Sequence, residues 1–465
     1  MTDLRVITSD GDDAIIEEGV VQEFAGSLRG PLLRPGDAGY DQARIVWNGM
    51  IDRHPAMIAH CTGVADVLAA VCFARTHGVR VSVKGGGHNI TGNAVCEGGL
   101  MIDLSPMKSV RIDLQKRIAR AEAGLNWGEF NRETQAFGLA TTGGVVSTTG
   151  IAGLTLGGGL GWLMGKHGLS CDNLLSADIV TADGQFLTAS AEQNPDLFWG
   201  LRGGGGNFGV VTSFEYRLYP VTSVLAGMVV HPMDQAKEVL RFYRDFARSS
   251  PDEMITAAAL LTSHEGAPVA AIIAGYIGDI AAGEAVVAPL RRFGTPLADT
   301  IAPTSYCELN SLFDAAVPYG NVQRYWKSSF LKELPDDLID IFVARSAKLP
   351  SPMSMVMFFH MCGAPTRVDH NDTAFGLRQD QWDYDVISQW ADPAETALHV
   401  QWTRDFWNAV EPFATGEVYV NHLDAEEATR IRAAYGGHYD RLAALKNKYD
   451  PTNLFRLNQN IRPTV

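Results

Sequence analysis

A run of three glycines directly before a histidine is the feature that most constrains this chain. The run lies in Lys84-Gly85-Gly86-Gly87-His88-Asn89, after the apolar, strand-like residues 79–83. Glycine is favoured where a backbone takes unusual dihedral angles or comes close to a ligand, and successive free N–H groups in such a turn form a concavity that suits phosphate. The stretch predicts a strand followed by a ligand-binding turn. The alternative is a tight surface turn with a solvent-exposed histidine.

A second glycine-rich stretch covers residues 142–161, where eight of twenty positions are glycine. Glycine loses more conformational freedom on folding than other residues, so a run of this density needs a compensating contact. We expect a large ligand laid along this backbone. Close packing of two strands is the alternative.

The third glycine cluster, at residues 202–211, contains a literal GxGxxG in Gly204, Gly206 and Gly209. A Rossmann motif needs a strand before it and a helix after it, whereas here the helix-like residues 195–199 precede and the strand-like residues 210–214 follow. A Walker A loop is also absent around Gly165-Lys166. The three clusters therefore indicate another kind of dinucleotide cradle.

Composition narrows the class of protein. With 465 residues, 46% of them hydrophobic, the chain is long enough for two or three domains. The net charge of −15 argues against nucleic acid or an anionic membrane as the main partner, because both need a clustered basic surface. The six cysteines show no CxxC or metal-finger spacing, and no HExxH or paired-histidine spacing occurs, so we expect no metal site.

The N-terminus lacks a basic segment followed by an apolar core, and no apolar run approaches the length of a membrane span. The scattered cysteines are typical of buried thiols in a reducing compartment. We therefore expect a soluble, cytoplasmic protein.

The alternation of short apolar runs and helical patterns predicts an α+β protein with a domain boundary near residue 220. Before the boundary we expect strands at 56–61, 99–104 and 118–123 and helices at 64–77 and 127–137. After it we expect strands at 254–261, 269–277, 323–331 and 354–361 and helices at 235–248, 281–293 and 395–410. Such a sheet, with helices on one side, leaves its other face free to form a pocket. The last fifty residues predict a strand at 416–422 and helices at 425–435 and 439–448.

Four motifs, in the same order, resemble those of the flavin oxidases similar to berberine bridge enzyme, within the vanillyl-alcohol-oxidase superfamily. They are residues 83–88, residues 150–161 continuing to 166–173, residues 204–212, and residues 449–455 before 458–461. The resemblance covers nearly the whole chain. It implies a two-lobed PCMH-type FAD-binding domain at residues 1–220, with its core at about 45–220. It also implies a substrate-binding domain at 221–415, in which helices cover one side of an antiparallel sheet. The C-terminal segment at 416–465 is expected to return to the FAD-binding domain.

The same resemblance implies FAD as cofactor, with its pyrophosphate over the first glycine turn and His88 bonded covalently to the flavin 8α methyl. Val146 stands where many relatives carry a second, cysteinyl link, so a single link is expected, as in bacterial members such as the 6-hydroxynicotine oxidases. The residues expected to bind FAD are Lys84, Gly85, Gly86, Gly87, His88, Asn89, Gly92, Gly143, Gly144, Thr148, Gly150, Gly153, Leu154, Gly157, Gly158, Gly161, Gly168, Leu169, Asn207, Gly209, Val210, Val211, Asn421 and Asn458.

The catalytic candidates are Tyr419, His422, His360 and Arg367. Residues 416–424 resemble the family's Tyr-x-Asn-Tyr-x-Asp strand, with His422 where the second tyrosine is common. In a regular strand Tyr419 and Asn421 share one face and His422 lies on the other. His422 is a candidate base or a structural histidine, and Tyr419 a candidate substrate contact or a packing residue.

His360 is a second candidate histidine, and Arg367 stands where some relatives hold a catalytic glutamate. Arg367 binds an anionic group or forms an ordinary salt bridge.

The resemblance implies an oxidase that transfers hydride from a C–OH or C–N carbon of a small organic substrate to flavin N5 and passes the electrons to O2, giving hydrogen peroxide. A dehydrogenase with another acceptor, and a flavin-bearing cyclase or binding protein, are the alternatives. Aromatic residues between 306 and 330 indicate an apolar pocket. An alcohol, an amine, a sugar and an aromatic metabolite all remain open as substrates, and the sequence does not determine the oligomeric state.

Overall fold

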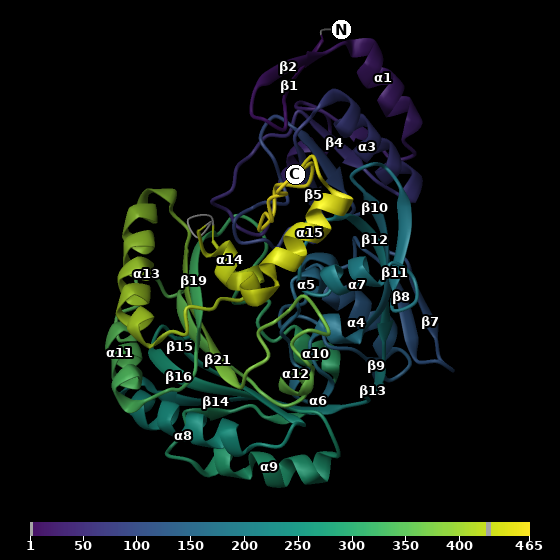
Figure 1. The fold of residues 1–465 in the computed structure, drawn as a ribbon. Helices are drawn as coiled ribbons and strands as arrows, with labels where there is room; N and C mark the ends of the chain where they lie inside the picture. Colours follow the sequence, from purple (N-terminus) through teal and green to yellow (C-terminus); the bar gives the residue numbers. More distant parts are fainter. Residues whose placement is uncertain (1–2, 425–428) are drawn as a thin grey trace.

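The computed structural model describes residues 3–424 and 429–465. The first half of the chain is built around two sheets (Figure 1). The smaller one has the spatial order β3 (Leu32–Leu33), β4 (Met57–His60), β6 (Leu100–Asp103) and β5 (Val81–Lys84), in which β4, β6 and β5 are parallel. Helix α3 (Val64–His77) makes the crossover from β4 to β5 and ends at Gly78, which adopts a left-handed conformation. The first glycine turn therefore begins at the carboxyl end of β5.

The second sheet of this half is antiparallel. Its order is β11 (Phe186–Ser190), β10 (Leu174–Thr181), β12 (Gly209–Arg217), β8 (Ile118–Glu122) and β7 (Val110–Asp113). Helix α4 (Trp127–Gln135) follows β8 and begins at a reciprocal capping box between Asn126 and Glu129. The third glycine cluster therefore leads into β12, which lies between β10 and β8.

The second half of the chain forms an eight-stranded antiparallel sheet. Its order is β17 (Ala298–Asp299), β14 (Val224–Pro232), β16 (Pro268–Tyr276), β15 (Met254–Thr262), β20 (Met355–Met361), β21 (Gln381–Trp390) and β19 (Gln323–Leu331), with β18 (Ala302–Thr304) paired to β14. Helices α8 (Ala236–Ser249), α9 (Ile280–Arg292), α11 (Asp336–Ser346) and α13 (Thr396–Val410) cover one face (Figure 1). The opposite face is turned toward the glycine-rich half.

The two faces of this large sheet are separated by strict alternation. On β20, Val356 and Phe358 pack into the helix-side core, whereas Met357 and Phe359 line an internal cavity. On β21, Trp382 and its i+2 neighbours likewise belong to the helix side. Because successive side chains of a strand point to opposite faces, the residues between them are delivered to the cavity.

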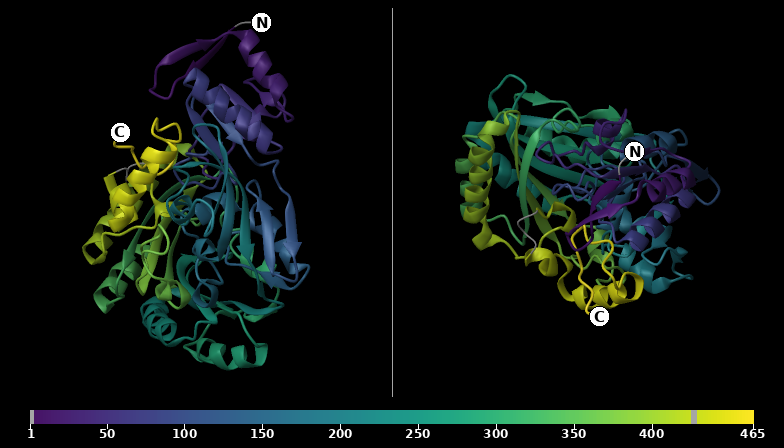
Figure 2. Two further views of the ribbon diagram at one scale, coloured as in Figure 1. Left: turned by 45° about the vertical axis from the view of Figure 1, so that its right-hand side comes forward. Right: turned by 90° about the horizontal axis from the view of Figure 1, so that it is seen from above.

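The N-terminal and C-terminal segments lie in different parts of the molecule (Figure 2). At the N-terminus β1 (Leu4–Ile7), β2 (Asp13–Ile16) and α1 (Glu18–Ser27) form a hairpin and a helix at the end of the molecule opposite α9. At the C-terminus α14 (Ile431–Tyr435) and α15 (Tyr439–Tyr449) return to the glycine-rich half. The described helices include none with both the length and the apolar character that a membrane-spanning helix requires.

A buried lysine holds this C-terminal segment in place. Lys446 on α15 forms an ion pair with Asp450 at 2.6 Å, and neither side chain is exposed. Its ammonium group also donates to the carbonyl oxygens of Asn207 and Phe455. These contacts join α15 to the third glycine cluster and to the chain that follows the helix.

Most predicted elements are confirmed, but the C-terminal strand prediction was wrong. Residues 416–422 form no strand; only a short 3-10 turn, Val420–His422, is present there. In place of the expected helix at 425–435 the described residues contain α14, and residues 425–428 lie outside the described part. The second glycine stretch contains a short helix, α5 (Ile151–Leu156), and the strands β14 and β21 were not predicted.

Replacing Lys446 with methionine should lower the free energy of unfolding by ~3 kcal/mol or more, because it leaves the Asp450 carboxylate buried without its charge partner. Lys448→Met is the matched control, since Lys448 pairs with Asp196 while 58% exposed and should cost less than ~1 kcal/mol. Urea denaturation followed by tryptophan fluorescence measures both. Equal losses in the two variants would contradict the structural role of Lys446.

Candidate active site

A cavity of about 320 Å³ lies between the glycine-rich turns and the open face of the large sheet. Backbone from all three glycine clusters lines one side. The sheet supplies mainly apolar side chains on the other, and the segments around 419–422 and 455–459 complete the wall. The cavity therefore brings together five segments that were predicted from the sequence to bind cofactor or substrate. They are the three glycine clusters and the segments around 419–422 and 455–459.

His88 stands at the end of the first glycine turn and faces this cavity. Its Nε2 atom is 2.7 Å from the Thr148 hydroxyl, and its Nδ1 atom is 3.5 Å from that of Thr149. The ring stacks on Trp47 with centroids 5.1 Å apart. Burial, together with the nearby charge of Arg324, lowers the pKa of His88 to about 3. His88 is therefore a neutral imidazole with hydroxyl groups beside both nitrogens.

The glycines serve two separate purposes. A Cβ on Gly153 or Gly206 would meet no atom within 4 Å, so these residues leave space open for a ligand. A Cβ on Gly86 would lie 2.4 Å from the Cα of Gly150, and one on Gly161 would lie 1.6 Å from the carbonyl oxygen of Gly143. Both explanations considered for the glycine-rich stretch hold in part, because some glycines face the cavity and others permit close backbone crossings.

The expected FAD-binding residues divide in the same way. Those that line the cavity are Gly85, Gly86, Gly87, His88, Asn89, Gly150, Gly153, Leu154, Gly161, Gly209, Val210, Val211, Asn421 and Asn458. Those that do not line it are Lys84, Gly92, Gly143, Gly144, Thr148, Gly157, Gly158, Gly168, Leu169 and Asn207.

The second group supports the wall from behind. The Lys84 ammonium donates to the carbonyl oxygens of Ala43 and Ile45, and the Asn207 amide donates to Gly204 and Gln459. The side-chain polar groups of Lys84 and Asn207 are thus used within the chain and brace the wall, and the contact of the ten residues with FAD stays a prediction.

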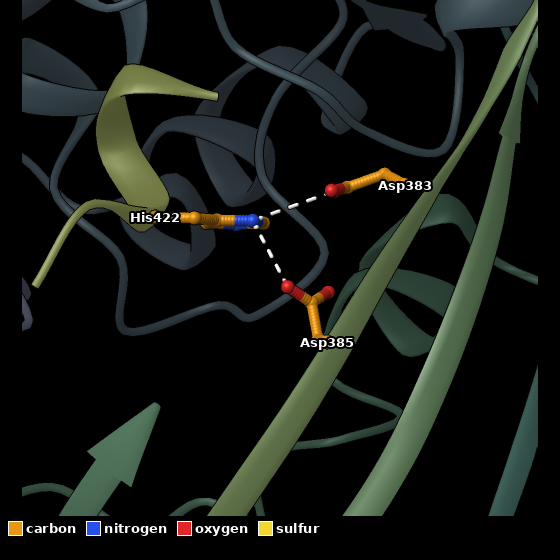
Figure 3. A group of neighbouring side chains, drawn as sticks. All are labelled: Asp383, Asp385 and His422. Carbon is orange, nitrogen blue, oxygen red and sulfur yellow. Dashed lines mark ion pairs between the residues drawn. The ribbon is translucent and has the colours of Figure 1, made fainter. Parts of the chain in front are cut away.

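Three titratable side chains meet at the sheet side of the cavity. His422 Nδ1 lies 3.1 Å from Asp385 Oδ1 and 3.4 Å from Asp383 Oδ2, and both carboxylates point to the same nitrogen (Figure 3). Asp383 and Asp385 are two residues apart on β21 and therefore share its cavity face. The Trp326 indole N–H donates to Asp385 at 2.8 Å, and Ser328 donates to Asp383 at 3.1 Å. We call Asp383, Asp385 and His422 the acidic cluster.

The charges of the acidic cluster are coupled. Burial alone would lower the pKa of His422, but Asp385 and Asp383 raise it to about 10. Burial and the neighbouring Asp385 raise the pKa of Asp383 to about 6. His422 is thus an imidazolium at neutral pH and cannot accept a proton there. Of the two alternatives for His422, this charge state favours the structural histidine over the base, and it leaves the carboxylates as the groups of the cluster able to take up a proton.

Tyr419 and Asn421 play a different part. The Tyr419 hydroxyl accepts the backbone N–H of Gly159 at 2.8 Å and a hydrogen bond from the Asn421 amide at 2.7 Å. The rings of Tyr419 and His422 lie 4.8 Å apart. The expected separation of these residues on opposite strand faces was wrong, because the 3-10 turn brings all three to the cavity wall.

His360 and Arg367 do not reach the cavity. His360 lies on the helix side of β20, pairs with Asp380 at 2.6 Å and stacks on Trp382. Arg367 pairs with Asp252 at 2.6 Å and is 58% exposed. The structure therefore corrects both catalytic assignments, and for Arg367 it favours the ordinary salt bridge.

Asp383 and Asp385 are not among the residues predicted from the sequence. Their signal is the alternation Trp382-Asp383-Tyr384-Asp385-Val386, which places two carboxylates on one face of a strand and apolar side chains on the other. Of the aromatic residues at 306–330, Phe313 and Trp326 line the cavity. Val146 lines it as well, and none of the six cysteines does.

Comparison with known proteins gives the family. A model described as FAD binding domain matches residues 55–190, and one described as berberine and berberine like matches residues 418–462. An FAD-linked oxidoreductase of Dictyostelium discoideum is 32% identical over 96% of this chain and 97% of its own. The chain belongs to the berberine-bridge-enzyme-like FAD-linked oxidoreductases.

Three matches to proteins named by their activity show how far the likeness extends. The (R)-6-hydroxynicotine oxidase of Paenarthrobacter nicotinovorans is 30% identical over 94% of this chain and 97% of its own. The crystal structure of 6-hydroxy-D-nicotine oxidase from Arthrobacter nicotinovorans superimposes with a TM-score of 0.85 at 30% identity, covering 94% of this chain and 98% of that one. A chitooligosaccharide oxidase superimposes with a TM-score of 0.83 at 26% identity, covering 96% of this chain and 100% of that one.

The cavity of this berberine-bridge-enzyme-like protein suits FAD. Open backbone at Gly153 and Gly206 leaves room along the glycine clusters. Two cavity-lining amides, Asn458 Oδ1 and Gln459 Nε2, are buried without a hydrogen-bond partner. The described lining residues include no lysine or arginine, so the backbone N–H groups of the glycine turns and neutral side-chain donors such as Gln459 Nε2 are available for a pyrophosphate.

Histidine-selective NMR of the purified protein should show His422 as an imidazolium throughout the neutral range, titrating near pH 10. A histidine whose pKa is raised on folding stabilises the folded state below its unfolded pKa of about 6.5, and this contribution disappears as the pH rises through about 10. His422→Gln assigns the resonance. A titration at or below pH 6.5 would contradict the charge assignment.

Proposed function

We propose that this FAD-linked oxidoreductase is an oxidase that removes hydride from a C–OH or C–N carbon of a small organic substrate and passes the electrons to O2, giving hydrogen peroxide. The observation that carries the proposal is one cavity with a neutral histidine on the glycine side and the acidic cluster on the sheet side. This arrangement offers a fixed attachment point for the cofactor opposite a group that accepts a proton.

We also propose that His88 holds the cofactor through a single covalent bond to the flavin 8α methyl. Two features of the residue support this. Its imidazole is neutral, so a nitrogen lone pair is free to bond, and Trp47 together with Thr148 fixes the ring. The side chain at position 146 is valine, which offers no thiol for a second link.

Bound in this cavity, FAD would supply the hydride acceptor at N5. The acidic cluster accepts the proton of the substrate O–H or N–H as the C–H bond breaks. A base works best when its pKa lies near the operating pH, and the raised pKa of Asp383 meets that condition. His422 and the Trp326 N–H fix the two carboxylates, while the apolar sheet residues keep water away from the reacting carbon.

The residue limits proposed for the three parts of the chain are 1–220, 221–415 and 416–465. Strand β14 opens the large sheet at Val224, and the lysine contacts of α15 tie the last part to the glycine-rich half. These positions support a substrate domain inserted between two parts of a cofactor domain.

His88→Ala should abolish covalent flavin. Acid precipitation of the wild-type protein should leave yellow colour in the pellet, and the same treatment of His88→Ala should release it. His54→Ala is the matched control, because His54 lies on the surface beside Asp52. Release of all flavin from the wild-type protein would overturn the covalent link while leaving the redox function open.

Asp385→Asn and Asp383→Asn should each slow anaerobic flavin reduction by a reducing substrate about 100-fold or more, because the substrate proton loses its acceptor. Asp252→Asn, which alters only the surface pair with Arg367, should leave the rate unchanged. Substrates of the alcohol, amine, sugar and aromatic classes are tested by bleaching of the flavin. Bleaching that O2 does not reverse would indicate a dehydrogenase, and no bleaching by any class would favour a cyclase or binding protein.

A further inference from the structure

The acidic cluster carries a negative charge that no other side chain of the cavity lining balances. With both carboxylates ionised and His422 protonated, the acidic cluster has a net charge of −1. The other titratable residues among the described lining are His88 and Tyr419, both uncharged at neutral pH, and no lysine or arginine is present. A charge buried without full compensation is costly, and a bound cation would relieve that cost.

The acidic cluster also has an unused acceptor. Asp383 is 0% exposed, and its Oδ2 atom accepts no hydrogen bond. Its nearest cationic neighbour is His422 Nδ1 at 3.4 Å, which lies closer to Asp385. A buried carboxylate oxygen without a donor is expensive in an interior, so the cavity is short of a hydrogen-bond donor at this end.

The rest of the sheet side is apolar. Its lining side chains are those of Phe313, Val317, Met355, Met357, Phe359 and Ile387. A sugar would leave several hydroxyl groups without partners against such a wall, which is unfavourable, whereas an aromatic or aliphatic body packs well there. An anionic substrate would meet the negative charge of the cluster.

We propose that the substrate is an apolar amine that binds as its ammonium ion, with the N–H groups directed at Asp383 and Asp385. This rests on the proposed function and narrows its C–OH or C–N choice to C–N. The ammonium N–H proton passes to the acidic cluster, and bound FAD would accept the hydride of the adjacent carbon at N5. The substrate leaves as an iminium ion, and O2 would take up the two electrons together with two protons, one that came with the hydride and one from the acidic cluster, to give hydrogen peroxide.

The test uses three ligands of similar shape with the flavin-loaded enzyme. N-methylbenzylamine is the cation, benzyl methyl ether is its neutral counterpart, and benzoate is the anion. Binding is read anaerobically as the perturbation of the flavin visible spectrum. We expect the amine to bind about tenfold or more tightly than the ether, as a charge-assisted hydrogen bond allows, and benzoate to bind most weakly. Because this comparison uses the wild-type protein, it does not depend on the folding of any variant.

The variants then place the effect at the acidic cluster. Asp385→Asn and Asp383→Asn should each reduce the preference for the amine over the ether about tenfold, and Asp252→Asn should leave it unchanged. The proposal is overturned if the ether or benzoate binds as tightly as the amine, if millimolar amine produces no spectral change, or if both asparagine variants keep the full preference.

Failure here and failure of the proposed function give different results. If alcohols reduce the flavin and binding shows no preference for the amine, the oxidase proposal is retained and the amine proposal is rejected. If the amine binds tightly but no substrate class reduces the flavin, the cation-binding site is supported and the oxidase proposal is rejected.

Discussion

The architecture of the site depends on a backbone contact that admits no side chain. The first glycine turn crosses the entrance to α5 so closely that a Cβ on Gly86 would overlap Gly150, and a Cβ on Gly150 would lie 2.4 Å from the Gly86 nitrogen. This crossing sets His88 beside the hydroxyls of Thr148 and Thr149. It also leaves bare backbone facing the cavity, where N–H groups are available to a bound anion.

The opposite wall depends on the period of a β-strand. Alternation on β21 sends Trp382 and Tyr384 to the helices and delivers Asp383 and Asp385 to the cavity. The turn at Val420–His422 then adds the imidazolium that pairs with both carboxylates. The large sheet therefore positions the acidic cluster, and the backbone crossing positions His88 on the opposite side of the cavity.

Many of the helices and strands were predictable from the sequence, because local patterns of apolar residues and glycines determine their limits. Helix α3 follows its predicted limits because its apolar face is continuous and Gly78 stops it in a left-handed conformation. Residues 416–422 misled because Val418 and Val420 alternate like a strand, whereas Tyr419 bonds to Gly159, far away in sequence, in place of a neighbouring strand. The pairing of His422 with Asp383 and Asp385 likewise joins distant segments. Such contacts are set by the fold, and no local pattern reports them.

The proposed function requires one cavity that holds FAD with its ring system between His88 and the acidic cluster. A crystal structure of the purified flavoprotein tests this most directly. We expect continuous electron density from the His88 imidazole to the dimethylbenzene ring of the flavin, with the Asp383 and Asp385 carboxylates facing the region beside N5. Flavin density elsewhere in the protein, or an isoalloxazine ring turned away from the acidic cluster, would contradict it.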